Sequence, residues 1–139
     1  MKILTISALM MSLVAAPAFA QEVEFGDDSG DWSNDNECDD PRFEGPGMTQ
    51  TPLLFDDVNR DASDCATAFY AGEISQIGVG PDGTIDFGDD SSEWANDGEC
   101  DDLRFVGEAM TDTPLLAGDI MRDATDCRMG YEVEMLFLR

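Results

Sequence analysis

The hydrophobic and polar positions of this chain follow the same order twice. Residues 25–65 and 87–127 align without a gap at an offset of 62, and 27 of the 41 positions are identical. Within each copy the apolar residues form short clusters instead of one long helical or strand period. Repetition at a fixed spacing predicts two similar units in tandem. We place these units at residues 21–77 and 85–139, joined by a turn or linker at residues 78–84.

Local patterns predict only short elements. Alternating apolar and acidic residues indicate a strand at the start of each unit, at residues 23–25 and 85–87. In the first unit a short helix is predicted to begin after Asp61 as its N-cap and to end near Gly72. The equivalent segment of the second unit has a weaker helical pattern. Its tail, residues 131–138, predicts a closing strand.

The turn between the units and the apolar clusters complete this picture. Residues 74–79 and 84–87 are expected to pair as a hairpin across the glycine-rich residues 80–83. Trp32 and Trp94 recur at the repeat spacing, and we expect them to fill the core. The alternative is a disordered acidic chain, which the recurring aromatic residues, leucines and cysteines argue against.

The four cysteines also follow the repeat. Cys38 and Cys65 match Cys100 and Cys127, and of the three connectivities symmetry favours one bridge within each unit. Each bridge would close a loop worth about 3.6 kcal/mol in the chain-entropy description. A four-cysteine zinc site is the competing interpretation, but the paired Cys-x-x-Cys spacing is absent. The expected fold is a small, loop-rich α+β fold of two tandem disulfide-stapled repeats, with short strands and one short helix each.

The first 20 residues have the pattern of a signal peptide. A basic start at Lys2 precedes an apolar run over residues 3–16, and small residues then lead to a cleavage site after Ala20. We therefore expect a periplasmic or secreted protein, in a compartment that favours disulfides.

Charge limits the partners and the chemistry. The chain has 31 acidic residues, seven basic ones and no histidine, and its formal net charge is −24. Nucleic acids and anionic membrane surfaces are excluded, because both need basic patches. Cations are the expected partners: a divalent metal ion, or a basic protein or polymer. No histidine-based catalysis is available, and units this small offer little cleft for paired-carboxylate hydrolysis, so we do not expect an enzyme.

Acids crowd around each cysteine. One cluster surrounds the first cysteine of each unit and another precedes the second, and a bridge within the unit would bring both together. A hard cation would relieve the resulting repulsion, and calcium takes six to eight oxygen ligands. The candidate ligands are Asp35, Glu37, Asp39, Asp40, Asp61 and Asp64, and in the second unit Asp97, Glu99, Asp101, Asp102, Asp123 and Asp126. The four arginines Arg42, Arg60, Arg104 and Arg122 recur among these acids and are interpreted as internal ion-pair partners.

These segments carry a family resemblance. Residues 96–101, Asn-Asp-Gly-Glu-Cys-Asp, followed by Arg-Asp-Ala-Thr-Asp-Cys at residues 122–127, resemble the calcium modules of Lin12/Notch repeats and LDL-receptor class A domains. The resemblance implies Asp101, Asp123 and Asp126 as calcium ligands. By repeat it also implies Asp39, Asp61 and Asp64. Residues 87–105 further resemble an acidic repeat of secreted bacterial proteins. Each unit here can have one disulfide, where the modules have three.

The sequence thus supports two hypotheses. The first is an exported, non-enzymatic calcium-binding protein, in which the metal orders clustered carboxylates. The alternative is an acidic interaction module that binds a basic protein or polymer without metal. Retention of particular acids in both copies favours the first, because a requirement for charge alone would let them drift.

Overall fold

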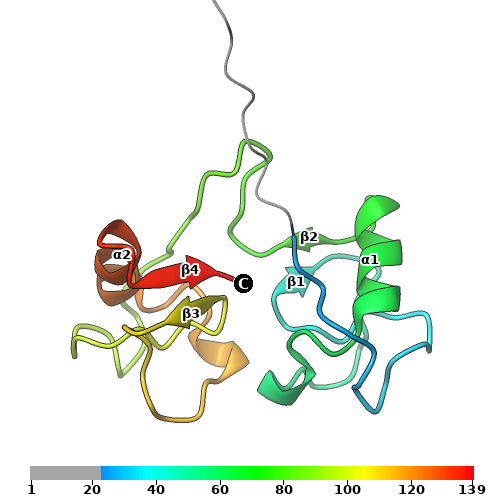
Figure 1. The fold of residues 1–139 in the computed structure, drawn as a ribbon, viewed down its shortest axis with the longest axis horizontal. Coiled ribbons are helices and arrows are strands. Elements are labelled where there is room, and N and C mark those ends of the chain that lie inside the picture. Colours follow the sequence, from blue (N-terminus) through cyan, green and yellow to red (C-terminus); the bar gives the residue numbers. More distant parts are fainter. Residues whose placement is uncertain (1–22) are drawn as a thin grey trace, which may run out of the picture.

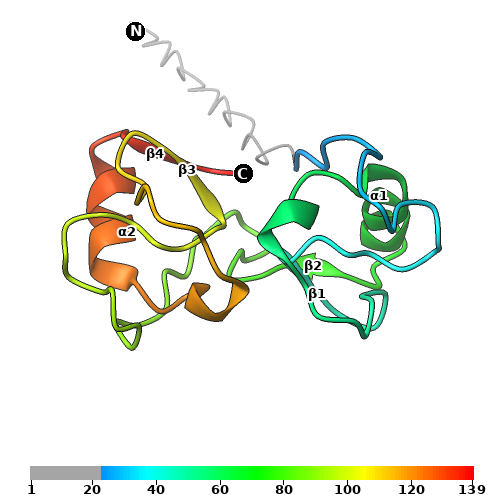
Figure 2. The same ribbon diagram turned by 90° about the horizontal axis from the view of Figure 1, so that it is seen from below.

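The structure, a computed structural model of the chain, describes residues 23–139. The predicted signal peptide, residues 1–20, lies outside the described residues. Two similar units lie side by side, joined by a loop at the top of Figure 1, and their helices α1 and α2 lie on opposite outer sides of the pair. Figure 2 shows the same arrangement from below, with the two short 3-10 helices near the middle.

Each unit has the same four elements in the same order. The first unit contains β1 (Phe43–Glu44), η1 (Phe55–Asp57), α1 (Ala62–Tyr70) and β2 (Ser75–Gln76). The second contains β3 (Phe105–Gly107), η2 (Ala117–Asp119), α2 (Ala124–Glu132) and β4 (Leu136–Leu138). The pairs β1–β2 and β3–β4 are antiparallel, with Phe43 opposite Gln76 and Phe105 opposite Leu138. This confirms the small, loop-rich α+β class.

Both helices have nine residues, so the expectation of a weaker second helix was wrong. An acid distant in sequence explains this. Asp28 accepts hydrogen bonds from the backbone N–H and the hydroxyl of Ser63, at 2.7 and 2.6 Å. Asp90 does the same for Thr125 at the start of α2. Free N–H groups in the first turn are satisfied by this contact, which a reading of local helical pattern cannot detect. Neither helix is long and apolar enough to cross a membrane, and no other described helix is.

The predicted opening strands do not form. Residues 23–25 lead only to an isolated bridge between Gly26 and Arg60. Gly26 has a φ of +81°, a left-handed conformation that interrupts an extended chain. The turn at residues 80–83 does bring its flanks together, through a bridge between Val79 and Ile85. The strand β2, however, pairs with β1 and takes no part in that hairpin.

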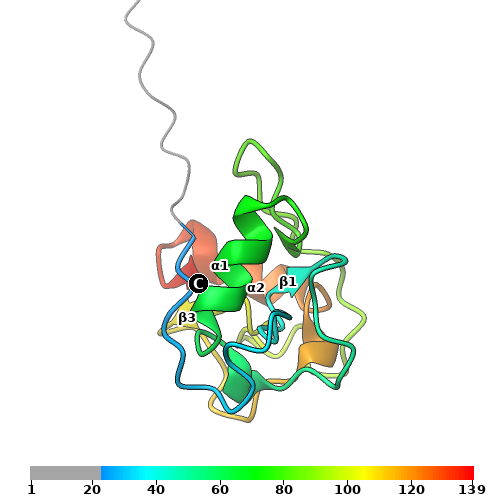
Figure 3. The same cartoon turned by 90° about the vertical axis from the view of Figure 1, so that its right-hand side faces the viewer.

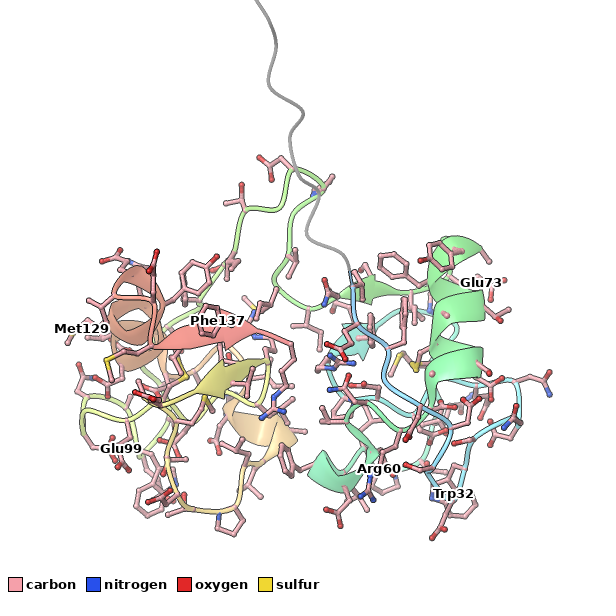
Figure 4. All side chains as sticks on the ribbon, viewed as in Figure 1. Trp32, Arg60, Glu73, Glu99, Met129 and Phe137 are labelled. Carbon is pink, nitrogen blue, oxygen red and sulfur yellow. A yellow bond between two sulfur atoms is a disulfide. The ribbon has the colours of Figure 1, made fainter. Side chains whose placement is uncertain are left out.

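The core of each unit is built on its disulfide and on stacked aromatic rings. Cys38, Phe43 and Cys65 are almost fully buried in the first unit. In the second unit the rings of Phe87 and Phe105 stack at 5.5 Å. The tryptophans do not join these cores: Trp32 is 56% exposed and Trp94 49%, which overturns the prediction that they fill them. Figure 4 shows Trp32 at the outer edge of its unit.

The two units pack against each other through a small apolar cluster and several polar contacts. Val58 of the first unit packs with Leu103 and Leu115 of the second. The guanidinium of Arg104 also donates to the carbonyl of Ile77 at 3.0 Å. Figure 3, a view along the line joining the units, shows one unit in front of the other. The leucine pairs at residues 53–54 and 115–116 contribute only in part, because Leu115 is buried and Leu116 is exposed.

Candidate metal centre

One disulfide in each unit fixes the acidic loop to the helix. Cys38 is bonded to Cys65 and Cys100 to Cys127, with Cα atoms 4.6 and 4.7 Å apart. This is the connectivity that symmetry favoured. All four cysteines are therefore oxidised, and the two disulfides indicate an oxidising, extracellular environment.

Asp61 is the centre of the first site. It occupies the N-cap position of α1, but its side chain does not cap the helix. Its Oδ2 instead accepts a hydrogen bond from the backbone N–H of Asp39 at 2.8 Å and lies 3.6 Å from the Sγ of Cys65. That sulfur is in a disulfide and has no proton to donate. Asp123 makes the same contacts with Asp101 and Cys127.

Two carboxylate oxygens in each unit are buried without a hydrogen-bond partner. They are Oδ1 of Asp61 and Oδ2 of Asp39 in the first unit, and Oδ1 of Asp123 and Oδ2 of Asp101 in the second. These residues are at most 4% exposed. Buried carboxylates are normally paired or hydrogen-bonded, because an isolated buried charge costs several kcal/mol. In both units, the carboxylate oxygens at the same two positions therefore lack a hydrogen-bond donor or a cation.

The pKa values of these carboxyl groups are raised by their burial close to other carboxylates. Burial raises the pKa of Asp61 to about 6, and the charges of Asp64, Asp39 and Asp35 add to this rise. The pKa of Asp123 is likewise raised to about 6, with burial again the main cause. Burial, followed by the charges of Asp35 and Asp57, also raises the pKa of Asp39. In the metal-free protein at neutral pH, several negative charges thus face one another around Asp61.

The acidic loop before the first cysteine is folded over the start of the helix. Asp64 accepts hydrogen bonds from the backbone N–H groups of Asp35 and Asn36, at 2.8 and 3.1 Å. Asn34 and Asn36 both have positive φ, at 68° and 78°, and asparagine tolerates this conformation better than most residues. In the second unit Asp126 accepts the N–H of Gly98. Residues 34–36 and 96–98 therefore form a tight loop through their backbone conformation. This role does not depend on the carboxylates of Asp35 and Asp97.

Two of the predicted ligands lie at the exposed rim of this loop. Asp35 accepts the backbone N–H of Glu37 at 3.0 Å, and both side chains are exposed. Asp97 and Glu99 form the same turn. Figure 4 shows Glu99 at the periphery of its unit. Their charges still act on the centre, since those of Asp35 and Glu37 both contribute to the raised pKa of Asp39.

Asp40 and Asp102 were predicted as ligands, but the structure gives them another role. Asp40 forms a buried salt bridge with Arg42 at 2.6 Å, and both of its oxygens accept hydrogen bonds from that guanidinium. Its Oδ2 also accepts the N–H of Asn59. Asp102 and Arg104 form the same pair. With their lone pairs used in this way, these carboxylates are not free to bind metal. The expectation that Arg42 and Arg104 form internal ion pairs is confirmed, whereas Arg60 and Arg122 form none among the described residues.

The sequence reasoning missed one acid in each unit. Asp57, in η1, raises the pKa of Asp39 through its charge, and Asp119 in η2 acts on Asp101 in the same way. Asp57 and Asp119 occupy equivalent positions in the two copies, and the acid is retained although its neighbour Asp56 is replaced by Gly118. That retention was the available signal.

Each unit thus assembles a group that could hold a metal ion. A carboxylate oxygen of Asp61 and the sulfurs of Cys38 and Cys65 lie within 4.8 Å of one another, as do those of Asp123, Cys100 and Cys127. Thiolates are the form of cysteine that ligates metals. With both disulfides closed, the sulfurs are poor ligands and the carboxylate oxygens remain.

No family model, no curated protein and no solved structure matches this chain. The resemblance to Lin12/Notch and LDL-receptor class A modules therefore stays an expectation.

Proposed function

We propose that this chain is an exported, non-enzymatic protein that binds one calcium ion in each of its two units. The observation that carries the proposal is the pair of buried, unpartnered carboxylate oxygens on Asp61 and Asp39, repeated on Asp123 and Asp101. A cation among these oxygens would satisfy them and neutralise the charges around them. Asp64 and Asp57 in the first unit, with Asp126 and Asp119 in the second, supply further oxygens nearby.

The available donors favour calcium over other metals. The chain has no histidine, and its cysteines are in disulfides, so zinc and copper lack their usual ligands. Calcium accepts carboxylates, backbone carbonyls and water in flexible arrangements, whereas magnesium keeps most of its own water. Extracellular calcium modules bind with dissociation constants of about 0.1–1 mM. At tenfold excess over such a constant, binding stabilises a unit by about 1.4 kcal/mol.

Calcium titration of the oxidised protein by calorimetry tests this proposal. We expect two sites per chain. Asp61→Asn and Asp123→Asn should each remove one of them, leaving the other unit's site at its original affinity. Magnesium at the same concentration should give little heat. An absence of saturable binding at 5–10 mM calcium, well above the expected range, would contradict the proposal.

The chain provides a matched control for charge alone. Asp112 is exposed, and the first unit has Gln50 at the equivalent position, so the repeat itself tolerates an uncharged residue there. Asp112→Asn removes the same charge as Asp123→Asn without touching the site. If both substitutions weaken calcium binding equally, the ion is held by diffuse charge. The acidic interaction module, which binds a basic protein or polymer without metal, would then be the better description.

A further inference from the structure

Each unit has a phenylalanine at the same repeat position, Phe25 in the first and Phe87 in the second, but the residues around the two rings differ. In the second unit the guanidinium of Arg128, on α2, lies over the ring of Phe87 with its carbon 5.3 Å from the ring centroid. Its charge also helps to lower the pKa of Asp90, after the hydrogen bonds from Thr125. The equivalent ring in the first unit is Phe25, and the helix position that corresponds to Arg128 is Ala66.

The loss of this side chain coincides with an open groove. A groove of about 620 Å³ lies between residues 23–26 and the face of α1 formed by Ala62, Ser63 and Ala66. Phe25 lines it, as does Glu24, whose side chain is exposed. Asp28, the counterpart of Asp90, holds Ser63 at the edge of the groove. The aromatic ring and the acid are thus retained in the first unit, and the cation is missing. The ring of Tyr70, where the second unit has Glu132, also lies 6.0 Å from that of Phe25, but Tyr70 is 80% exposed.

We infer that this groove binds an arginine side chain of another protein, with the guanidinium over Phe25 and close to Asp28 and Glu24. A guanidinium stacks on an aromatic face and pairs with carboxylates, and arginine does both better than lysine. The net charge of −24 would also attract a basic partner and speed its association. This inference is independent of calcium binding.

The protein's own arginines do not fill the groove. All six lie within the described residues 23–139. Four lie over other rings, namely Arg42 over Phe43, Arg104 over Phe105, Arg128 over Phe87 and Arg139 over Phe55. No described arginine lies over Phe25.

Exchanging the two helix residues tests the inference. The probe is the blocked peptide acetyl-Gly-Arg-Gly-amide, titrated into the ¹⁵N-labelled oxidised protein at physiological salt and followed by amide chemical shifts. We expect saturable shifts at Phe25, Gly26, Ser63 and Ala66. The lysine analogue should bind about three- to fivefold more weakly, as expected for the loss of a stacked guanidinium.

We expect the two variants to change peptide binding in opposite directions. Ala66→Arg should fill the groove from within and abolish the shifts, while Arg128→Ala should open a second site with shifts around Phe87. Because the two substitutions lie in different units, loss of folding in one leaves the other informative. The inference is overturned if Ala66→Arg binds the peptide as the original protein does, or if Arg128→Ala gains no site. Shifts spread over the acidic surface, with no preference for arginine, would also overturn it. So would self-association that Ala66→Arg abolishes, because the occupant would then be a second copy of this chain.

Discussion

Replacement of both Asp61 and Asp123, one buried aspartate in each unit, by asparagine should stabilise the metal-free protein at neutral pH and remove its response to calcium. In the folded, metal-free chain the pKa of Asp61 and of Asp123 is raised to about 6, from an ordinary value of 3.8. The folded state therefore holds these protons more tightly than the unfolded state does. Ionisation of each carboxyl group above pH 6 then opposes folding.

The size of this effect follows from the shift. A difference of about two pKa units corresponds to about 3 kcal/mol for each carboxyl group, at 1.36 kcal/mol per unit. The sign is set by proton linkage: the folded state binds more protons between pH 4 and pH 6, so stability falls as pH rises through this range. Asparagine has no charge to lose. The variants Asp61→Asn and Asp123→Asn should therefore match the original protein near pH 4 and exceed it at pH 7.5, each by up to about 3 kcal/mol.

Urea unfolding, followed by circular dichroism with the disulfides intact, measures this difference. Metal-free samples at pH 4 and pH 7.5 are compared with samples in 5 mM calcium. Calcium should stabilise the original protein at pH 7.5 and have about half this effect on either single variant. Asp112→Asn serves as the control and should keep the full calcium response.

Two results would refute the reasoning. Metal-free variants that are no more stable than the original protein at pH 7.5 would mean that the buried carboxylates are not under strain. Variants that gain as much stability from calcium as the original protein would mean that the ion binds elsewhere.

Other predictions address the parts around this centre. Calcium affinity, measured by calorimetry, should fall by about tenfold per pH unit below pH 6, because calcium and protons compete for the same carboxylates. Replacing Cys38 and Cys65 by serine should cost about 3–4 kcal/mol in urea unfolding and remove the calcium site of the first unit only. Asp102→Ala should cost about 3–5 kcal/mol, because Arg104 would be left buried and unpaired; an unchanged unfolding midpoint would argue against the buried pair. Gly88→Ala should cost at least about 1–2 kcal/mol, since φ is +82° and a Cβ there would collide with the backbone carbonyl of Met121, and a thermal melt would show it.

The repeat predicted more of the fold than local patterns did. Recurrence of the cysteines at a spacing of 62 gave the disulfide pairing and the two-unit α+β organisation, both of which the structure confirms. Strand and helix strengths were harder to predict, because long-range contacts decide them. The start of α2 depends on Asp90, which lies 35 residues before Thr125, and no window along the sequence contains both.

The tryptophans show the limit of reasoning from residue type. Trp32 and Trp94 are large and recur, which suggested a core position, yet both are about half exposed. The core instead uses Phe25 with Phe43, and Phe87 with Phe105, stacked beside the disulfides. Recurrence in two copies shows that a residue matters to the unit, but it does not show whether that residue is buried.

The acids were found as a group, but their separate roles could not be read from spacing. Asp39 and Asp40 are neighbours in the sequence, yet Asp39 faces the candidate centre and Asp40 is paired with Arg42. One signal was available, because an arginine follows two residues after Asp40 and after Asp102. Combining that signal with the expected ion pairs would have removed these two acids from the ligand set.

That neighbouring ion pair supplies the strongest argument for an external cation. The first unit buries Asp40 on one side, and Asp39 with Asp61 on the other. The two sides lie close together, since the charge of Asp40 acts on Asp57, which in turn acts on Asp39. At Asp40 the chain provides its own cation, and Arg42 meets both carboxylate oxygens. At Asp61 and Asp39 it provides none, although their oxygens are equally buried. Because two copies of the unit have kept this difference, the uncompensated side is better explained as a place for an ion from solution than as a defect of packing.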